Sequence, residues 1–155
     1  DDDDGDVAHP SSETAVISVG GSTLKGTSWS GSSEGDNNGR FLPLPVLLPR
    51  NDPHKKPEIV APGERVPVLT MDGGWGLADG TSAATVYVTG ALALLLEENP
   101  SLKANGSQGS ADNINLVKNW LMDSAVPQED QSGHDDRFGY GLLQIEALLD
   151  QANSQ

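Results

Sequence analysis

A long stretch without a formal charge constrains this chain more than any other feature. No Asp, Glu, Lys, Arg or His lies between Asp79 and Glu97. From Thr81 to Leu96 the residues are apolar or small on every side of a helix, and such a helix is normally buried. The stretch is shorter than the ~20 apolar residues that a membrane span needs, and it contains Gly90 and three Thr. We therefore predict a buried core helix and no membrane span.

Small side chains should let this helix pack closely against a sheet. Helical spacing predicts that Val86, Val88 and Leu92 lie elsewhere than its main apolar face. That face is predicted to hold Ala83, Ala84, Tyr87, Gly90, Ala91, Leu94 and Leu95.

Short strands and further helices surround this helix in the sequence. Apolar, β-branched runs predict strands at 15–21, 58–63 and 65–69, with loop at 22–39 and a glycine-rich tip at 71–76. Helical spacing of Ile114, Val117, Trp120 and Leu121 predicts a helix from about Asp112, its N-cap, to Ser124. A last helix is predicted from Leu142 to about Ala152. Strands that alternate with helices predict an α/β fold with a mainly parallel sheet.

The segment from Phe41 to Pro49 alternates large apolar residues with prolines. Proline cannot donate to a sheet ladder, so the segment is predicted to be neither a central strand nor a helix. It could be a docking surface for a partner or membrane, or a loop folded over the protein's own core. We favour the second interpretation because apolar loops usually cover something.

The charge balance excludes some partners. Nine Lys and Arg stand against 23 Asp and Glu, a net charge of −14, which argues against binding to nucleic acid phosphates. The chain has no cysteine, which excludes disulfides and thiolate metal sites.

The most informative candidate site is Asp79–Gly80–Thr81–Ser82–Ala83–Ala84. A serine in the first turn of a buried helix lies at the positive end of the helix dipole, beside N–H groups that lack intrahelical partners. Such a hydroxyl can attack a carbonyl while the same N–H groups bind the oxyanion that forms. The alternative is an ordinary helix cap, since Thr and Ser often begin helices.

The context of this serine resembles the subtilases, the subtilisin-like serine proteases. Their serine motif, Gly-Thr-Ser-x-Ala-x-Pro-x-Val-x-Gly, corresponds to residues 80–90 here, with six of seven specified positions matched. Three further segments resemble the family in the same order: His9–Pro10 with 16–20, residues 36–40 with 56–63, and 138–143.

The resemblance implies a serine endopeptidase with a subtilisin-like, three-layer α/β catalytic domain. Ser82 would be the nucleophile and its N–H an oxyanion donor, while Gly80 and Thr81 would shape the substrate-side turn. In the family, the catalytic aspartate, the histidine and the oxyanion-hole asparagine precede the segment that this chain resembles. We therefore expect residues 1–155 to be the C-terminal part of the domain, inactive alone, with the N-terminal part and a polypeptide substrate as partners.

No histidine of the chain has the context of the family's base. His9 precedes Pro, His54 precedes two Lys and His134 precedes two Asp. Val86 stands where the family has proline, and Tyr87 where bacterial members often have histidine. These departures and the insertion at about 41–54 leave open an alternative, a catalytically inactive subtilase-like domain that binds or scaffolds.

The resemblance requires no cofactor for the chemistry. Structural calcium occurs in the family, but Asp2–Asp4 lack the spacing of an EF-hand, and Asp130, Asp135 and Asp136 are interpreted as a charged loop. We assign no metal ligand. The family's habit implies a secreted or extracytoplasmic location.

Overall fold

The computed structural model describes residues 7, 9–35, 37, 40–41, 47–103 and 111–154. In chain order the helices and strands are β1 (Val19–Ser22), β2 (Arg40–Phe41), β3 (Leu47–Leu48), β4 (Ile59–Pro62), β5 (Val66–Leu69), β6 (Trp75–Ala78), α1 (Thr81–Glu98), a 3₁₀ turn (Pro100–Leu102), α2 (Ala111–Ser124) and α3 (Ile145–Asn153). The parallel strands β1 and β4 with α1 packed against them confirm the predicted α/β class.

β1 and β4 form a two-stranded parallel sheet, with Val19 opposite Ile59 and Ser22 opposite Pro62, while β2–β3 and β5–β6 are separate antiparallel pairs. Ile59, Val60 and Ala61 are fully buried, as expected for a parallel strand that is covered on both faces. The strand predicted at 15–21 begins later than expected, at Val19. Residues 9–16 instead form turns, in which Val16 N–H donates to Glu13 O at 3.2 Å.

The other edge of β4 bonds to the segment after the acidic loop. Val60 N–H donates to Gly141 O at 3.0 Å, and Leu143 N–H donates to Val60 O at 2.9 Å. The last helix was predicted to start at Leu142, and that boundary is wrong because this segment forms hydrogen bonds with β4 before the helix begins. α3 therefore begins at Ile145.

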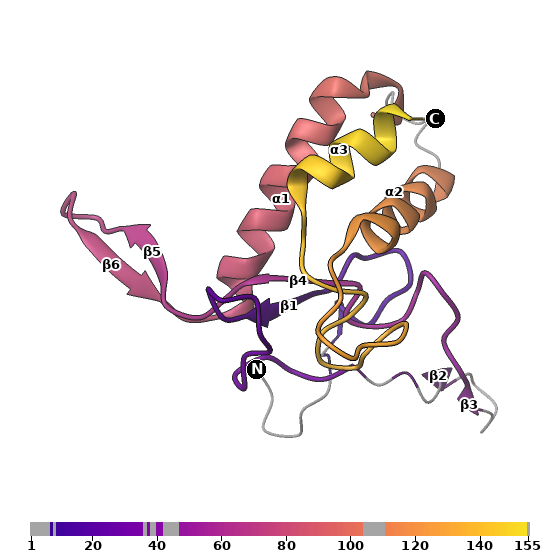
Figure 1. The fold of residues 1–155 in the computed structure, drawn as a ribbon, viewed down its shortest axis with the longest axis horizontal. Coiled ribbons are helices and arrows are strands. Elements are labelled where there is room, and N and C mark those ends of the chain that lie inside the picture. The colour runs from indigo at the N-terminus through magenta and orange to yellow at the C-terminus, as the bar shows by residue number, and fades with distance from the viewer. Residues whose placement is uncertain are drawn as a thin grey trace.

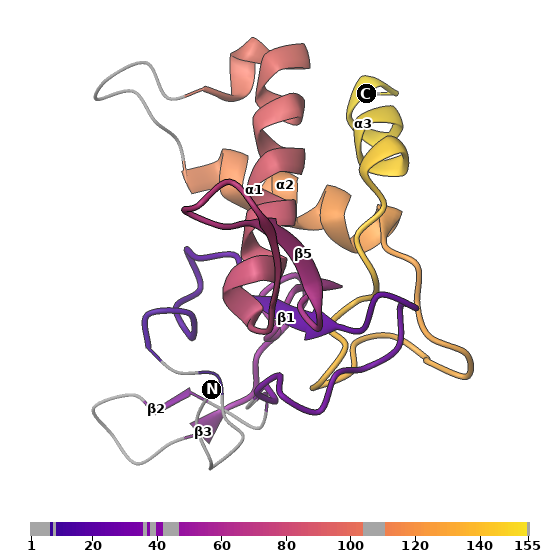
Figure 2. The same ribbon diagram turned by 90° about the vertical axis from the view of Figure 1, so that its left-hand side faces the viewer.

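α1 runs from the β1–β4 sheet to the far end of the molecule, with α2 and α3 beside it (Figures 1 and 2). Its buried residues, Ala84, Val88, Ala91 and Leu95, recur at intervals of three and four. The face predicted from spacing is therefore only partly right: Ala84, Ala91 and Leu95 are buried, but Tyr87, Gly90 and Leu94 are exposed, and Val88, which was predicted to lie elsewhere, is buried. The helix is buried on one side only in this chain.

Two clusters of buried residues make up the core. Ile59 and Ala61 of β4 pack against Ala84 and Val88 of α1. A second cluster joins the three helices through Ala91, Leu95, Trp120, Leu121, Leu148 and Ala152. α2 was predicted closely, although Asp112 lies within its first turn and is not its N-cap.

β5 and β6 form an antiparallel hairpin that extends away from the rest of the molecule (Figure 1). The strand at 65–69 was predicted, but Trp75 and Gly76 were assigned to the tip and belong to β6. The exposed side chains of this hairpin include Leu69, Met71, Trp75 and Leu77.

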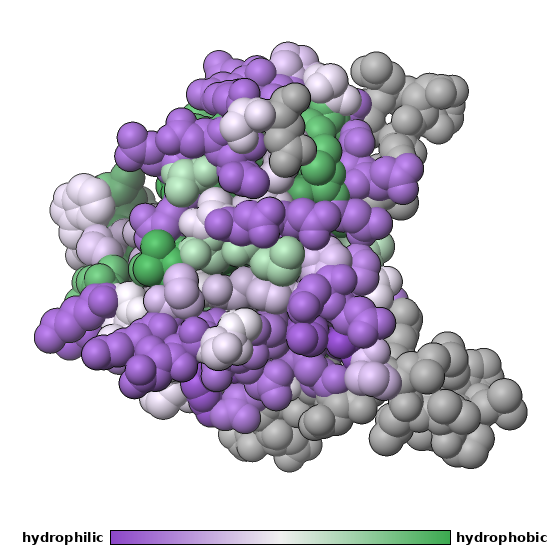
Figure 3. Space-filling view, turned by 45° about the vertical axis from the view of Figure 1, so that its right-hand side comes forward, coloured by the Kyte–Doolittle hydropathy of each residue, from purple (hydrophilic) through white to green (hydrophobic). Residues whose placement is uncertain are grey.

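Two segments lie largely outside the described residues. At the ends of the proline-rich segment, β2 and β3 pair antiparallel over two residues each. Residues 42–46 of that segment and residues 104–110 are not described, so the prediction that the segment forms neither a central strand nor a helix falls largely outside the described residues. The face drawn in Figure 3 is mostly hydrophilic, in keeping with the acidic composition.

Candidate active site

The turn that leads into α1 is held by backbone contacts with the end of β4. Gly80 N–H donates to Gly63 O at 2.8 Å, and Asp79 Oδ1 accepts the Arg65 N–H at 2.7 Å. Gly80 has φ 154°, a conformation that favours glycine. A Cβ on Gly63 would lie 3.0 Å from Gly80 O and 3.1 Å from Gly21 Cα. The close approach of three chain segments therefore favours glycine at position 63, and the backbone conformation favours it at position 80.

Ser82 follows this turn and is exposed at the start of α1. Gly80 offers no side-chain cap to the helix. Among the described residues, no acceptor bonds to the N–H groups of Thr81 or Ser82, and no side chain bonds to the Ser82 hydroxyl. The first turn thus presents a free hydroxyl and free N–H donors at the positive end of an 18-residue helix. This arrangement can bind an anion or oxyanion beside a nucleophilic hydroxyl.

Thr81 is half-buried and lines a small cavity of about 180 Å³ on the other side of the turn. The cavity borders β1 through Val19 and Gly20, and its remaining wall includes His9 and Ser11. Thr81 also packs near Gly21, because a Cβ added to Gly21 would lie 3.7 Å from Thr81 Cγ2. Of the three predicted site residues, Gly80 bonds to the end of β4, Thr81 is half-buried and Ser82 is exposed.

An apolar groove continues from the turn along the exposed side of α1. It has a volume of about 590 Å³ and is formed by α1, β5 and Ile145. Val86 is 70% exposed there, and Tyr87 and Leu94 are 39% and 45% exposed. Val86, which stands in place of the family's proline, is therefore a surface residue of the groove. Because large apolar side chains are exposed side by side, this face has the character of an interface.

The three histidines of the chain have neighbours other than Ser82. His9 Nδ1 lies 3.5 Å from Glu13 Oε1, and His54 lies within electrostatic reach of Lys118. Burial lowers the pKa of His54. The His134 side chain is only 2% exposed, and its Nε2–H donates to Pro57 O at 2.8 Å. Among the described residues, no hydrogen bond joins a histidine to Ser82.

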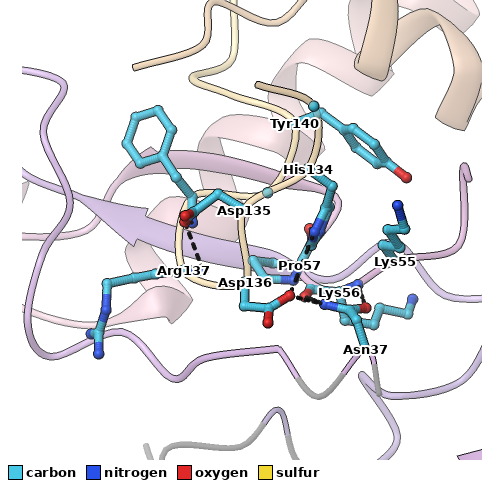
Figure 4. Close-up of polar contacts among 12 residues, drawn as sticks. Asn37, Lys55, Lys56, Pro57, His134, Asp135, Asp136, Arg137 and Tyr140 are labelled. Carbon is cyan, nitrogen blue, oxygen red and sulfur yellow. Dashed lines mark hydrogen bonds and ion pairs between the residues drawn. The ribbon is translucent and has the colours of Figure 1, made fainter. Parts of the chain in front are cut away.

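The loop that carries His134 is fastened to the segment before β4 (Figure 4). Asn37 Nδ2 donates to Lys56 O and to Asp136 Oδ1, while Lys56 N–H donates to Asn37 Oδ1. Burial lowers the pKa of His134, although the bond to Pro57 O opposes that shift. His134 and Asp136 of this loop therefore have structural partners.

Tyr140 fastens the same region from the other side. Its hydroxyl donates to Asp52 Oδ1 at 2.6 Å, and its ring meets the His134 ring edge-on at a centroid distance of 4.9 Å. Burial raises the pKa of Tyr140, and the hydrogen bond from Tyr140 lowers the pKa of Asp52. The predicted charged loop thus contains ordered contacts: Asp135 Oδ1, for example, accepts the N–H groups of Arg137 and Phe138.

Sequence reasoning missed a buried ion cluster of Lys56, Glu58 and Lys118. Their side chains are 0–1% exposed, and both ammonium groups contact one oxygen of Glu58. Lys56 and Glu58 flank Pro57 within a predicted motif, but nothing in the sequence pairs them with a lysine on α2. The 60-residue separation between Glu58 and Lys118 hides this contact from any local pattern.

Two further predictions concern metals and membranes. The described part of the chain contains no group of three or more His, Asp or Glu placed to hold a metal ion, and Asp2–Asp4 lie outside it. Among the described helices, none has the length and apolar character required to cross a bilayer.

Comparisons with known proteins place these features in a family. The sequence model of the subtilase family, peptidase S8, matches residues 1–141. Bacillopeptidase F of Bacillus subtilis (strain 168) is 36% identical over 92 residues, which are 57% of this chain and 6% of that protein.

Solved protease structures share the fold. The patellamide maturation protease PatA superposes with a TM-score of 0.67 and 25% identity, over 97% of this chain and 48% of that one. The prenylagaramide maturation protease PagA superposes with a TM-score of 0.66 and 28% identity, over 96% and 47%. The predicted subtilisin-like fold is thereby confirmed, and the chain spans about half the length of these structures. The chain belongs to the subtilase family of serine proteases.

Proposed function

We propose that this chain carries the nucleophile of a serine endopeptidase, and that Ser82 forms the acyl-enzyme. The observation that supports the proposal is the position of Ser82: exposed, in the first turn of α1, beside N–H groups without acceptors among the described residues. Gly80 supports it further, since an N-cap without a side chain keeps the approach to these donors open.

In the proposed mechanism, Ser82 Oγ attacks the carbonyl carbon of the scissile peptide bond, and its proton passes to a base. The carbonyl oxygen becomes an oxyanion that the Ser82 N–H stabilises, an effect worth about 3 to 4 kcal/mol per donor. Collapse of this intermediate breaks the C–N bond, the amine leaves with a proton from the base, and water later hydrolyses the acyl-enzyme. Gly80 and Thr81 shape the turn on the substrate side.

The base and the remaining oxyanion donor would come from an N-terminal part of the same catalytic domain. Two observations support this partner: the solved relatives are about twice as long as the match, and the apolar groove along α1 leaves Val86, Tyr87 and Leu94 exposed. An apolar surface of this kind is suited to burial against another layer of the fold. Accordingly, the 155-residue chain alone should not cleave peptides.

A fluorophosphonate probe tests the nucleophile directly, because it reacts only with an activated serine. The intact protein, which here means this chain together with the proposed N-terminal part, should become labelled. Peptide mapping should place the adduct on Ser82. The Ser82→Ala variant is the control and should remain unlabelled. A folded intact protein that is not labelled at Ser82 would contradict the proposal. The isolated chain should show no labelling above that of Ser82→Ala.

The second candidate is a catalytically inactive subtilase-like domain that binds or scaffolds. Val86 in place of proline favours it, as does the insertion at about 41–54. However, Val86 lies on the groove wall, one helical turn beyond Ser82, and an early helical turn can spare the N–H that proline lacks. The Val86→Pro variant discriminates between the candidates when the labelling rate is measured. If labelling is measurable in Val86→Pro but not in the parent protein, the inactive domain is favoured.

We also propose, from the family alone, that the protein acts outside the cytoplasm and needs no cofactor for the reaction. Structural calcium remains a proposal without assigned ligands. Unfolding curves of the intact protein with added Ca²⁺ and with a chelator check it, since a bound ion stabilises the folded state.

A further inference from the structure

The buried cluster of Lys56, Glu58 and Lys118 has two positive charges on one negative charge. Lys56 Nζ lies 2.7 Å and Lys118 Nζ 2.5 Å from the same atom, Glu58 Oε1. The second carboxylate oxygen, Oε2, accepts the Ser18 N–H at 2.7 Å. With both lysines protonated, the cluster would keep a net charge of +1 at a place with almost no solvent, which is costly.

The hydrogen-bond partners of the two lysines match neutral amines better than ammonium groups. Lys56 Nζ donates to Glu58 Oε1 and to Val16 O, and Lys118 Nζ donates to Glu58 Oε1 and to Thr14 O. An ammonium group has three N–H donors, whereas each nitrogen finds two acceptors among the described residues. Removing one proton therefore costs no hydrogen bond and removes the surplus charge.

The other charged groups near the cluster add to the same effect. His54 lies within electrostatic reach of Lys56, Glu58 and Lys118, and Arg50 reaches His54 in turn. The segment 14–18 contributes two carbonyls and the Ser18 N–H, none of which titrates. The loop with Asp136 meets Lys56 only through Asn37, at its backbone. In the described part of the chain, Glu58 is thus the one carboxylate that bonds to Lys56 and Lys118.

We propose that the Lys56–Glu58–Lys118 cluster is a pH-sensitive clamp between β4, α2 and the segment before β1, which becomes stronger when it loses one proton. Lys56 is the member that releases it. Burial lowers the pKa of Lys56 to about 8; Glu58 opposes this shift and Lys118 adds to it. An unfolded lysine keeps its proton up to about pH 10.4.

The sign of the effect follows from proton linkage. Between about pH 8 and 10 the unfolded chain binds one more proton at Lys56 than the folded chain does, so stability rises with pH. Below about pH 8 both states hold the proton, and the net charge of the cluster weakens the fold by a constant amount. The clamp is therefore strongest on the alkaline side, and this prediction does not depend on catalysis.

The test is an unfolding titration of the intact protein in a Ser82→Ala background, which prevents self-cleavage. From pH 8 to 9.5 the unfolding equilibrium constant should decrease by up to about tenfold per pH unit. Lys118→Met should weaken this dependence, because the remaining lysine and Glu58 form a neutral pair and Lys118 no longer adds to the shift that burial causes. Lys25→Met is the control, since this exposed side chain lies outside the cluster, and it should preserve the dependence.

A direct titration keeps the proposal testable if Lys118→Met does not fold. In an NMR titration of the protein with ε-¹³C-labelled lysine, one lysine signal should have its midpoint near pH 8, and Lys56→Met should remove it. The proposal is overturned if every lysine titrates above pH 10, if the parent protein loses stability from pH 8 to 9.5, or if Lys118→Met retains the full dependence.

Discussion

Replacing Glu58 with glutamine should be among the most destabilising changes of a single functional group in this chain. The carboxylate accepts three short bonds, from Lys56 Nζ, Lys118 Nζ and the Ser18 N–H. Glutamine can still accept the Ser18 N–H, but it provides no countercharge for the ammonium groups. Charge-assisted hydrogen bonds contribute about 1.5 to 3 kcal/mol each, so the loss of two should cost about 3 to 5 kcal/mol, as for other broken buried pairs.

Thermal unfolding of the Ser82→Ala protein at pH 7 measures this cost. A loss of 3 to 5 kcal/mol should lower Tm by on the order of 10 °C for a protein of this size. Lys118→Met provides the matched comparison, since it removes a charge but leaves Lys56 and Glu58 paired, and it should cost less than half as much. A Glu58→Gln variant that unfolds within about 2 °C of its parent would refute this account of the cluster.

Three further predictions concern the loop and the core. His134→Gln should reduce the loss of stability on acidification: burial lowers the pKa of His134, so the unfolded chain protonates first as pH falls below about 6.5. Tm measured from pH 7 to 5 checks this. Gly139→Ala should destabilise more than Gly133→Ala in urea unfolding. Both glycines have positive φ, so alanine at either position should lower the free energy of unfolding by about 1 to 2 kcal/mol. Only at Gly139 would the added Cβ also lie 2.8 Å from two carbonyl oxygens. Leu121→Ala should cost about 2 to 5 kcal/mol in the same assay, because Leu121 is fully buried.

Helices and strands were predicted best from the sequence where a single local pattern determines them. α1 was placed to within two residues because its start, a glycine before Thr81, and its end at Asn99 are both local signals. The side of α1 that is buried was predicted only in part, since a helix that is apolar all round has no face that stands out from spacing. Tertiary contacts with β4 selected Ala84 and Val88.

The candidate site was predicted from sequence only as far as it is local. Gly80, Thr81 and Ser82 follow one another, and the structure places them in one turn at the start of α1. Gly63 was predicted only as the end of the strand at 58–63, and its contact with Gly80 O depends on how β4 meets α1. The cluster around Glu58 depends on elements 40 and 60 residues away, which no motif connects.

The position of β4 between two distant segments has a consequence for how the chain folds. Its partner on one side, β1, comes about 40 residues earlier, and the segment at Gly141 comes roughly 80 residues later. Such pairings are formed late, because a long loop must close before any contact compensates for its lost entropy. During synthesis β4 should therefore wait with one edge unpaired until Gly141 has left the ribosome. That interval is when we expect this protein to depend most on chaperones and to be most prone to aggregation.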